Sequence, residues 1–412
     1  MARSTWNACG AARRADGAPR SVVIRVIPIR SNGLDTLRAL AIVLVFMYHY
    51  MVFVSGEPTF GWVSTVGWVG VDLFFVLSGY LIGNQIFSGL AQGRQLSLVT
   101  FYARRALRTW PAFWVVLAAY FLLPSVMGGR PPPALWKFLT FTQNYQLQPG
   151  TAFSHAWSLC IEEQFYLVLP LTVLIAMRVG TRRYQAWWLL LALLATGIVA
   201  RGVLWSMHGR ADMGGTPGYY PTIYYATLCR FDEFVPGIAV AMIKNFHPSV
   251  WQRLMTRGNA LFWAGMAAVG IALYGVHSHY QVEDYGYPFF MTVFGYSCIA
   301  AAFSVLVACA LSERSPLHFI RIPGASQLAR WSYSIYLSHK AVAFMLDRYA
   351  NQHAVGPSFK LLAIAATSVA VGALLYRLVE LPFMKLRDRH FPSLFRVSPP
   401  TASSRGVGSH FG

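Results

Sequence analysis

The first residues that could perform chemistry lie in an apolar run, LDTLRALAIVLVFMYHY, which carries Asp35, Arg38 and His49. Ionisable side chains at membrane depth are costly, and they usually face a protein interior or a wet cavity. Arg38 and His49 are eleven residues apart, so an α-helix leaves them about 20° apart in phase and roughly 16 Å apart along its axis. The run therefore predicts a helix that presents a cation and a titratable imidazole on one face.

The second concentration of polar side chains lies in FSHAWSLCIEEQFYLVLPL. Ser158, Glu162 and Tyr166 repeat every four residues and share a helix face, and His155 lies two turns before Glu162 on that side. The adjacent Glu163 is rotated by about 100°, so the two glutamates point in different directions. Glu162 is the carboxylate that we expect to orient a catalytic histidine, with Ser158 and Tyr166 beside it to contact a substrate.

Two further groups of charged residues interrupt apolar runs. Asp72 lies in GWVGVDLFFVLSGYLI, where a carboxylate needs a partner, and we expect it to support His49. RFDEFVPGIAV places Arg230 next to Asp232 and Glu233. Arg230 is a candidate for substrate binding, although an internal ion pair that holds helices together explains these residues equally well. The glycines of the first motif are as consistent with close helix packing as with a site.

A basic segment, FYARRALRTWP, contains Arg104, Arg105 and Arg108. Arg104 and Arg108 are four residues apart and face the same way on a helix, a spacing that can clamp phosphate groups. From spacing alone, charge that sets membrane topology on anionic lipid is the more common explanation. A lone histidine, His339 in WSYSIYLSHKAV, is more often a hydrogen-bonded packing residue than a catalytic one.

Composition indicates which elements must position these residues. The chain has 412 residues, of which 56% are hydrophobic and only 12% are charged, and it contains repeated apolar runs of about 20 residues. This pattern predicts an all-α polytopic membrane protein with about ten transmembrane helices. The expected spans are 34–54, 67–87, 111–127, 158–177, 186–206, 222–243, 259–277, 288–311, 334–350 and 359–380.

Most of the 34 Lys and Arg residues fall in segments that share one side of the membrane if both termini are cytoplasmic. We therefore expect a disordered basic tail over 1–32, a transmembrane domain over 33–384 and a cytoplasmic tail over 385–412. In that topology His49, Asp72, Ser158 and Glu162 lie toward the outer side. Arg38 and the basic segment lie toward the cytoplasm, where we expect Arg38, Arg104, Arg105 and Arg108 to bind a phosphate-rich donor, so a path leads from this donor to a histidine.

Two other classes of function are disfavoured. The net charge of +19 could suggest nucleic acid, but the basic residues are dispersed between apolar runs and do not form a patch. The five cysteines, Cys9, Cys160, Cys229, Cys298 and Cys309, lack metal-ligand spacing, so we expect no metal and read them as small apolar residues.

Taken in order, LDTLRALAIVLVFMYH, GVDLFFVLSGYLI, RRALRTWP, WSLCIEEQFYLVLP, RFDEFVPG, SYSIYLSH and VELP resemble the bacterial integral-membrane acyltransferase-3 family. The resemblance covers roughly residues 33 to 390. It implies a ten-helix enzyme of the bacterial plasma (inner) membrane that moves an acyl group, usually acetyl from acetyl-CoA, to a hydroxyl of a cell-surface carbohydrate. Thr36 and Tyr80 replace a commoner Gly and Phe, away from the catalytic positions.

By position, the resemblance assigns the family's Arg–His pattern to Arg38 and His49, its arginine motif to Arg105 and Arg108, and its Ser–Glu motif to Ser158 and Glu162. The partners that it implies are the lipid bilayer, acyl-CoA, a carbohydrate acceptor and proteins of polysaccharide biosynthesis. Some members carry an added hydrolase-like domain outside the membrane, which we do not expect here.

The transfer of an acyl group from a thioester to an alcohol needs a base near neutral pH, a carboxylate that orients it, and cations for the phosphates of CoA. Whether His49 acts as a base or carries the acyl group itself is left open by the sequence. Alternative acceptors are a macrolide-like metabolite and a lipid headgroup. The alternative class is a sugar or lipid transporter that uses the buried charges as a proton relay.

Overall fold

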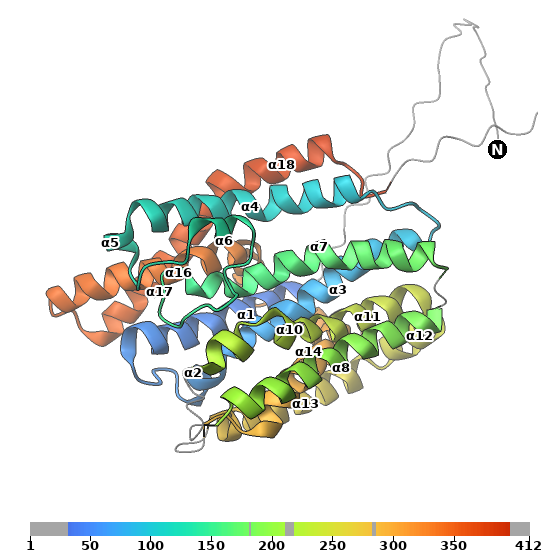
Figure 1. The fold of residues 1–412 in the computed structure, drawn as a ribbon, viewed down its shortest axis with the longest axis horizontal. Coiled ribbons are helices and arrows are strands. Elements are labelled where there is room, and N and C mark those ends of the chain that lie inside the picture. The colour runs from blue at the N-terminus through green and yellow to red at the C-terminus, as the bar shows by residue number, and fades with distance from the viewer. Residues whose placement is uncertain (1–31, 181–182, 211–217, 282–285, 396–412) are drawn as a thin grey trace, which may run out of the picture. The chain divides into compact units, whose positions relative to one another are not determined.

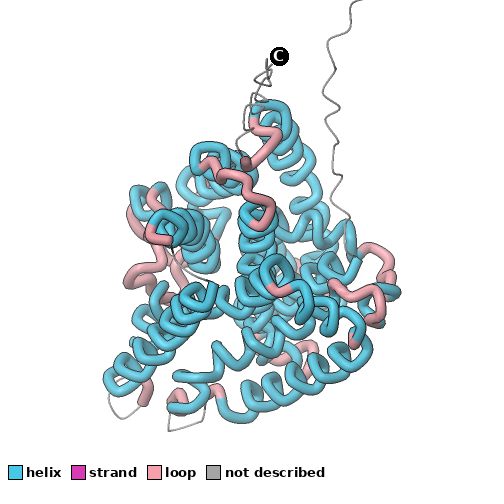
Figure 2. The backbone as a smooth tube through the Cα atoms, turned by 90° about the vertical axis from the view of Figure 1, so that its right-hand side faces the viewer, coloured by secondary structure: helices cyan, strands magenta, loops and turns pink. Residues whose placement is uncertain are grey.

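The computed structural model describes residues 32–180, 183–210, 218–281 and 286–395, and within these ranges the secondary structure is helical apart from isolated β-bridges. The long helices run side by side, and the connecting segments lie at the two ends of the bundle (Figure 1). Figure 2 looks at one of these ends and shows helices joined by short loops. The expected all-α fold is confirmed.

The first half of the chain contributes helices that carry most of the polar motifs. Their bounds are α1 Asn32–Tyr50 with its π-helical extension η1 Met51–Ser55, α2 Trp62–Val66, η2 Gly67–Val69, α3 Gly70–Leu90, α4 Leu98–Leu122, α5 Pro124–Met127, α6 Leu135–Leu139, η3 Ser154–Ala156, α7 Trp157–Arg178 and α8 Arg183–His208.

The second half begins with three short elements and ends with two long helices that pack together. The bounds are η5 Tyr220–Tyr224, α10 Thr227–Arg230, η6 Phe231–Phe234, α11 Val235–Phe246, α12 Pro248–Thr256, α13 Gly258–His279, η7 Met291–Gly295, α14 Tyr296–Ala310, α15 Pro316–Phe319, α16 Ala325–Gln352, α17 Pro357–Leu375, η8 Tyr376–Glu380 and α18 Leu381–His390.

Among the described residues, seven helical segments are long and apolar enough to cross a membrane, and they correspond to seven of the ten expected spans. They are Asn32–Ser55, Trp62–Leu90, Ser154–Arg178, Tyr184–His208, Gly258–His279, Met291–Ala310 and Pro357–His390. The other three expected spans fall on α4, on α10 to α11, and on α16, which are also helical. The last helix continues to His390, beyond the expected boundary at 384. The N-terminal tail and most of the C-terminal tail lie outside the described residues.

The helices differ sharply in how much of their surface other helices cover. The span that contains α3 is 83% buried, whereas the span formed by α13 is only 11% buried. The outer helices are apolar and uncovered, which is the property of a surface that contacts lipid tails. The inner helix α3 packs against α1, α11 and α14, and α1 also packs against α16. The polar motifs therefore lie where they are shielded from lipid.

Close packing between α3 and α11 depends on two glycines. A Cβ atom at Gly79 would collide with the carbonyl oxygen of Phe234, and one at Gly237 would collide with the carbonyl oxygen of Val76. Small residues at such crossings let helix backbones approach closely. For Gly79 the structure favours the packing interpretation over a direct role in a site.

Candidate active site

The centre of the candidate site is a pair of stacked imidazoles from two helices. His49 near the end of α1 and His339 on α16 have ring centroids 4.9 Å apart, and His49 Nδ1 lies 2.6 Å from His339 Nε2. The close packing of α1 on α16 makes this contact possible. The expected partner of His49 was a carboxylate, Glu162 or Asp72, and the structure places an imidazole there.

The hydrogen-bond partners fix the tautomers of both rings. His339 Nδ1 lies 2.9 Å from the carbonyl oxygen of Tyr336 and 3.1 Å from that of Ile335. A carbonyl only accepts, so His339 Nδ1 carries the hydrogen, and in the neutral ring Nε2 is then an acceptor. His49 Nδ1 must therefore donate to His339 Nε2. His49 Nε2 is left with a lone pair, which is the state required of a base or nucleophile.

Polar groups from η3 and α16 surround the pair. The His155 ring lies 5.3 Å from the His339 ring, and its Nε2 lies 3.3 Å from the carbonyl oxygen of Leu337. Lys340 Nζ donates to Ser154 Oγ at 2.9 Å. The lysine charge beside three imidazoles favours their neutral form, because like charges repel at short range.

Ser158 joins this cluster through Tyr336. The Tyr336 hydroxyl donates to the His155 carbonyl at 2.6 Å, so its oxygen accepts the hydrogen of Ser158 Oγ at 2.7 Å. Ser158 is buried, and this bond occupies its hydroxyl hydrogen. Its predicted contact with a substrate stays a prediction.

Glu162 lies one turn further along α7 and belongs to a different group of residues. Its carboxylate accepts from the Tyr166 hydroxyl at 2.8 Å, and Ser78 Oγ lies 3.2 Å from that hydroxyl. Arg38 is near enough for its charge to act on Glu162. The predicted divergence of the glutamates is confirmed, because Glu163 accepts from other donors on α4.

The three arginines of the basic segment differ in how fully they are engaged. Arg104 is paired with Asp388 at 3.5 Å and donates to the carbonyl of Phe391. Arg105 lies 5.6 Å from the centre of the Tyr166 ring, and its buried Nε has no hydrogen-bond partner among the described residues. Arg108 Nη1 donates to a weak acceptor, a methionine sulfur, at 3.6 Å.

These groups form a series through the bundle. Arg105, Tyr166 and Glu162 contact one another in turn, the charge of Glu162 acts on Tyr336 of α16, and Tyr336 lies beside the His339 ring. Sequence reasoning predicted a path between the arginines and a histidine. It placed Glu162 at the level of His49, whereas the structure places this carboxylate between the arginine segment and the histidines.

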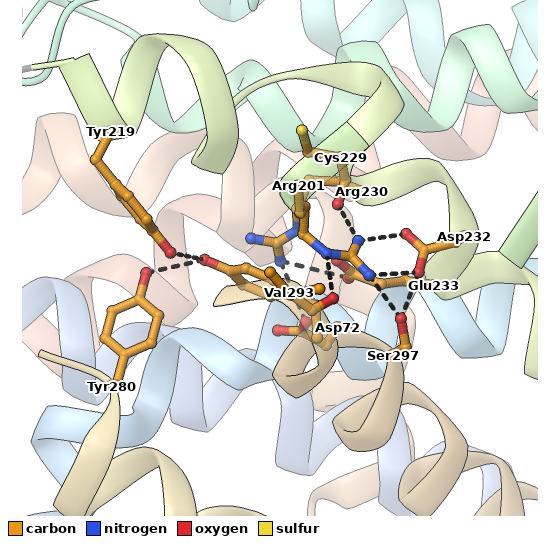
Figure 3. A network of polar contacts seen from close by, with 11 residues as sticks. Asp72, Arg201, Tyr219, Cys229, Arg230, Asp232, Glu233, Tyr280, Val293 and Ser297 are labelled. Atoms are coloured by element: carbon orange, nitrogen blue, oxygen red, sulfur yellow. Dashed lines mark hydrogen bonds and ion pairs between the residues drawn. The ribbon is translucent and has the colours of Figure 1, made fainter. Parts of the chain in front are cut away.

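Asp72 and Arg230 lie in a separate buried cluster, drawn in Figure 3. Arg230 pairs with Asp72 at 3.2 Å and with Glu233, and all three side chains are fully buried. The structure therefore brings Asp72 to an arginine and not to His49. The internal ion pair weighed from the sequence is present, and the catalytic and substrate-binding roles expected of Asp72 and Arg230 stay predictions.

A neighbouring pair in the same cluster was missed by sequence reasoning. Arg201 on α8 pairs with Asp232 at 2.7 Å and donates to Ser297 on α14 at 2.7 Å (Figure 3). Arg201 stands alone in an apolar run, and an isolated arginine in such a run is itself a sign of a buried partner. His339 was considered but interpreted as a packing residue.

Comparison with known proteins gives one family over most of the chain. The profile of the family described as "Acyltransferase domain" matches residues 31–377. That range includes His49, His339, Glu162 and the basic segment. No solved structure matches the chain.

Three curated bacterial proteins are similar to this chain. YrhL of Bacillus subtilis is 29% identical over 330 residues, which are 75% of this chain and 48% of YrhL. The peptidoglycan O-acetyltransferase OatA of Listeria monocytogenes is 26% identical over 86% of this chain and 56% of its own length. The O-acetyltransferase OatA of Staphylococcus aureus is 24% identical over 88% and 58%. The chain thus spans about half the length of these relatives.

Proposed function

This chain belongs to the acyltransferase domain family, and on that premise we propose that it is an O-acyltransferase embedded in the bacterial plasma membrane. It moves an acyl group, acetyl in the simplest case, from acyl-CoA to a hydroxyl of a carbohydrate. The relatives named as O-acetyltransferases support the choice of acetyl, and the one named for peptidoglycan supports a carbohydrate acceptor.

The observation that carries this proposal is the hydrogen-bonded pair of His49 and His339. His339 Nε2 accepts the hydrogen of His49 Nδ1 and holds the ring in the tautomer whose Nε2 can take a proton. A hydroxyl attacks a thioester well only when a base removes its proton in the transition state. His49 is the catalytic residue of this account, and His339 is its positioning residue.

The basic segment is suited to bind the donor. CoA supplies an activated acyl group as a thioester, together with a pyrophosphate and a 3′-phosphate that need cationic partners. Arg105 donates from Nη2 to Gln85, but its buried Nε has no hydrogen-bond partner among the described residues, and Arg108 Nη1 donates to a weak acceptor, so both can still donate to phosphate oxygens. Arg104 is committed to α18 and would act mainly by its charge.

Glu162 and Arg38 lie between the basic segment and the histidine pair, and they hold the polar groups between these two sites in place. Glu162 orients Tyr166, which faces Arg105, while Arg38 balances the negative charge of Glu162. A buried carboxylate is tolerated only when it is paired and hydrogen-bonded in this way. Their role is to keep a polar route open between donor and histidine.

The test is whether purified protein consumes acetyl-CoA. We expect slow hydrolysis without an acceptor and faster consumption when a soluble oligosaccharide is added, because a base and a donor site act on water as well. A control variant, His353→Gln, removes an exposed histidine remote from the pair and should behave as the parent does. A parent protein that never consumes acetyl-CoA would be a transporter or binding protein instead.

A further inference from the structure

A cavity of about 250 Å³ opens at the end of the bundle that carries α2, next to the end of α1. Its walls come from the last turns of α1 and η1, from α2 and η2, from η5, and from the end of α13. Several of its lining residues are exposed, among them Val52, His277 and Gln281, so the cavity is open to the outside. The contacts described above do not use it.

The cavity is lined by aromatic rings with a few polar groups at its edge. Tyr48, Trp68, Tyr220 and Tyr280 supply the rings. Thr65 and His277, which lie within hydrogen-bond distance at 3.2 Å, and Gln281 supply polar atoms. Aromatic faces carry negative charge and attract C–H groups that bear partial positive charge, while polar side chains satisfy hydroxyls.

The size and chemistry of the cavity select a class of ligand. Pockets for drug-sized molecules measure roughly 300–1,000 Å³, so this one suits a smaller body. A sugar ring offers a face of C–H groups and a rim of hydroxyls, which match aromatic walls and a polar edge. A lipid tail would form no hydrogen bonds with Thr65, His277 and Gln281, whereas the hydroxyls of a sugar can.

The cavity is next to the candidate base. Tyr48 lines the cavity, and its ring lies 5.8 Å from the ring of His49. Met51 and Val52, three and four residues after Tyr48, continue the same helix face into the cavity wall. A ligand held against Tyr48 thus lies at the end of α1 that carries His49, while the His49 ring itself lies on another face of the helix, against His339.

The rear wall is held rigidly by buried neighbours. The Trp68 ring lies 4.6 Å from the Tyr280 ring and is almost fully buried. The Tyr280 hydroxyl is hydrogen-bonded to that of Tyr296 at 3.0 Å, and Tyr296 lies 4.0 Å from the guanidinium of Arg230. The ion-pair cluster of Figure 3 therefore supports the wall of the cavity.

We infer that this cavity is the acceptor subsite and that it binds one ring of a carbohydrate by stacking on Tyr220. The role of the bound sugar as acceptor rests on the proposed transferase function. The binding of a sugar in the cavity does not, because it follows from the residues that line the cavity. The inference also gives Arg230 a supporting role behind the acceptor, without contact between them.

The experiment measures sugar binding without turnover. Saturation-transfer NMR on the protein in lipid nanodiscs would use two soluble probes, an N-acetylglucosamine tetramer and a glucose tetramer. We expect at least one probe to bind through its C–H protons. Tyr220→Ala should weaken that binding by about tenfold through the loss of one stacking face, and Tyr220→Phe should retain it.

A second variant guards against a folding defect. Val52→Trp places a large side chain at the exposed edge of the cavity and should block the probe while acetyl-CoA still binds. Tyr274→Ala, an exposed tyrosine of α13 outside the cavity, is the matched control and should bind the probe as the parent does.

Two failures can be told apart. If the parent binds neither probe, or if Val52→Trp and Tyr220→Ala bind as well as the parent, the assignment of the subsite is wrong even when acetyl-CoA is consumed. If the probe binds in the cavity and is blocked as expected while acetyl-CoA is never consumed, the subsite stands and the transferase function is wrong.

Discussion

His49 is oriented by a residue that lies 290 positions further along the chain, His339. In a Ser–His–Asp triad a carboxylate accepts the hydrogen bond that orients the imidazole. Here a second imidazole accepts that hydrogen bond, as a neutral group. A neutral acceptor fixes the tautomer without placing a negative charge in the membrane. The cost of a buried carboxylate beside the base is thereby avoided.

We expect the loss of this acceptor to reduce turnover. His339→Leu should lower kcat by about 10- to 100-fold, because His49 then populates both tautomers and only one can take the proton. His339→Gln should restore much of the rate, since an amide oxygen also accepts from Nδ1. The pH profile of kcat is the measurement, and an unchanged profile in the Leu variant would assign His339 to packing alone.

The arginines that remain free to donate should govern donor affinity. Arg108→Ala should weaken acetyl-CoA binding by about 1.5–3 kcal/mol, the scale of a charge-assisted hydrogen bond. Arg104→Ala should weaken it less, because Arg104 is already paired with Asp388. Calorimetric titration of both variants decides the matter, and equal affinity for parent and Arg108→Ala would leave these arginines as topology determinants.

At the residue scale, helical spacing predicted a polar face that carries His49, Arg38 and Glu162, and the family resemblance added the donor role of the basic segment; these roles stay predictions. Spacing could not identify His339 as the partner, because periodicity describes one helix and gives no information on which helix lies opposite. Asp72 was assigned to His49 for the same reason, since both fall within neighbouring apolar runs and the sequence carries no signal that Arg230 is nearer.

At the scale of elements, buried ion pairs join α3, α8, α14 and the short helices before α11. Arg201 and Asp232 have fully buried side chains that pair at 2.7 Å. Removal of one partner of a buried pair leaves an uncompensated charge, whereas removal of both is often tolerated. The cluster therefore stabilises the packing of helices whose other contacts are apolar.

Asp232→Leu should destabilise the protein by about 3–5 kcal/mol, because Arg201 is left charged and buried. Arg201→Met combined with Asp232→Leu should recover a large part of this loss. Thermal unfolding in detergent would measure both variants against the parent. A double variant as unstable as the single one would show that the pair holds the helices by more than charge neutralisation.

The sequence predicted the elements well where they are apolar and less well where they are broken. Seven expected spans match helices that can cross a membrane. The expected span 222–243 is instead a series of short turns, η5, α10 and η6, followed by α11. Arg230, Asp232 and Glu233 lie in these short helices. The ion pairs that they form determine the local backbone, so it does not continue as one helix with a 3.6-residue hydrophobic period.

At the scale of the whole molecule, the polar series lies where α1, α7 and α16 contact other helices, whereas apolar spans such as α8 and α13 are largely uncovered. This separation allows charged groups to sit at membrane depth without contact with lipid tails. The composition predicted the class, but it could not predict which helices are central. That distinction depends on packing between segments far apart in the sequence, such as α1 with α16.

The predicted topology sets the direction of the reaction. With both termini cytoplasmic, reporter fusions at Gly61 and Gly215 should report the outer side, and fusions at Gly93 and Gly258 should report the inner side; Gly215 lies outside the described residues. The outer placing of His49 and of the cavity would follow. Reversed reports at two of these positions would place the acceptor on the cytoplasmic side.

The most direct test of the account is transfer by His49→Gln. The variant keeps a polar side chain of similar reach but cannot take a proton, so acetyl transfer from acetyl-CoA to an oligosaccharide should fall by about 10²- to 10⁴-fold. Binding of acetyl-CoA, measured in the same preparation, should match the parent because the arginines are intact. Turnover within a few-fold of the parent would contradict the account, and would shift the search for the base to His155 and His339.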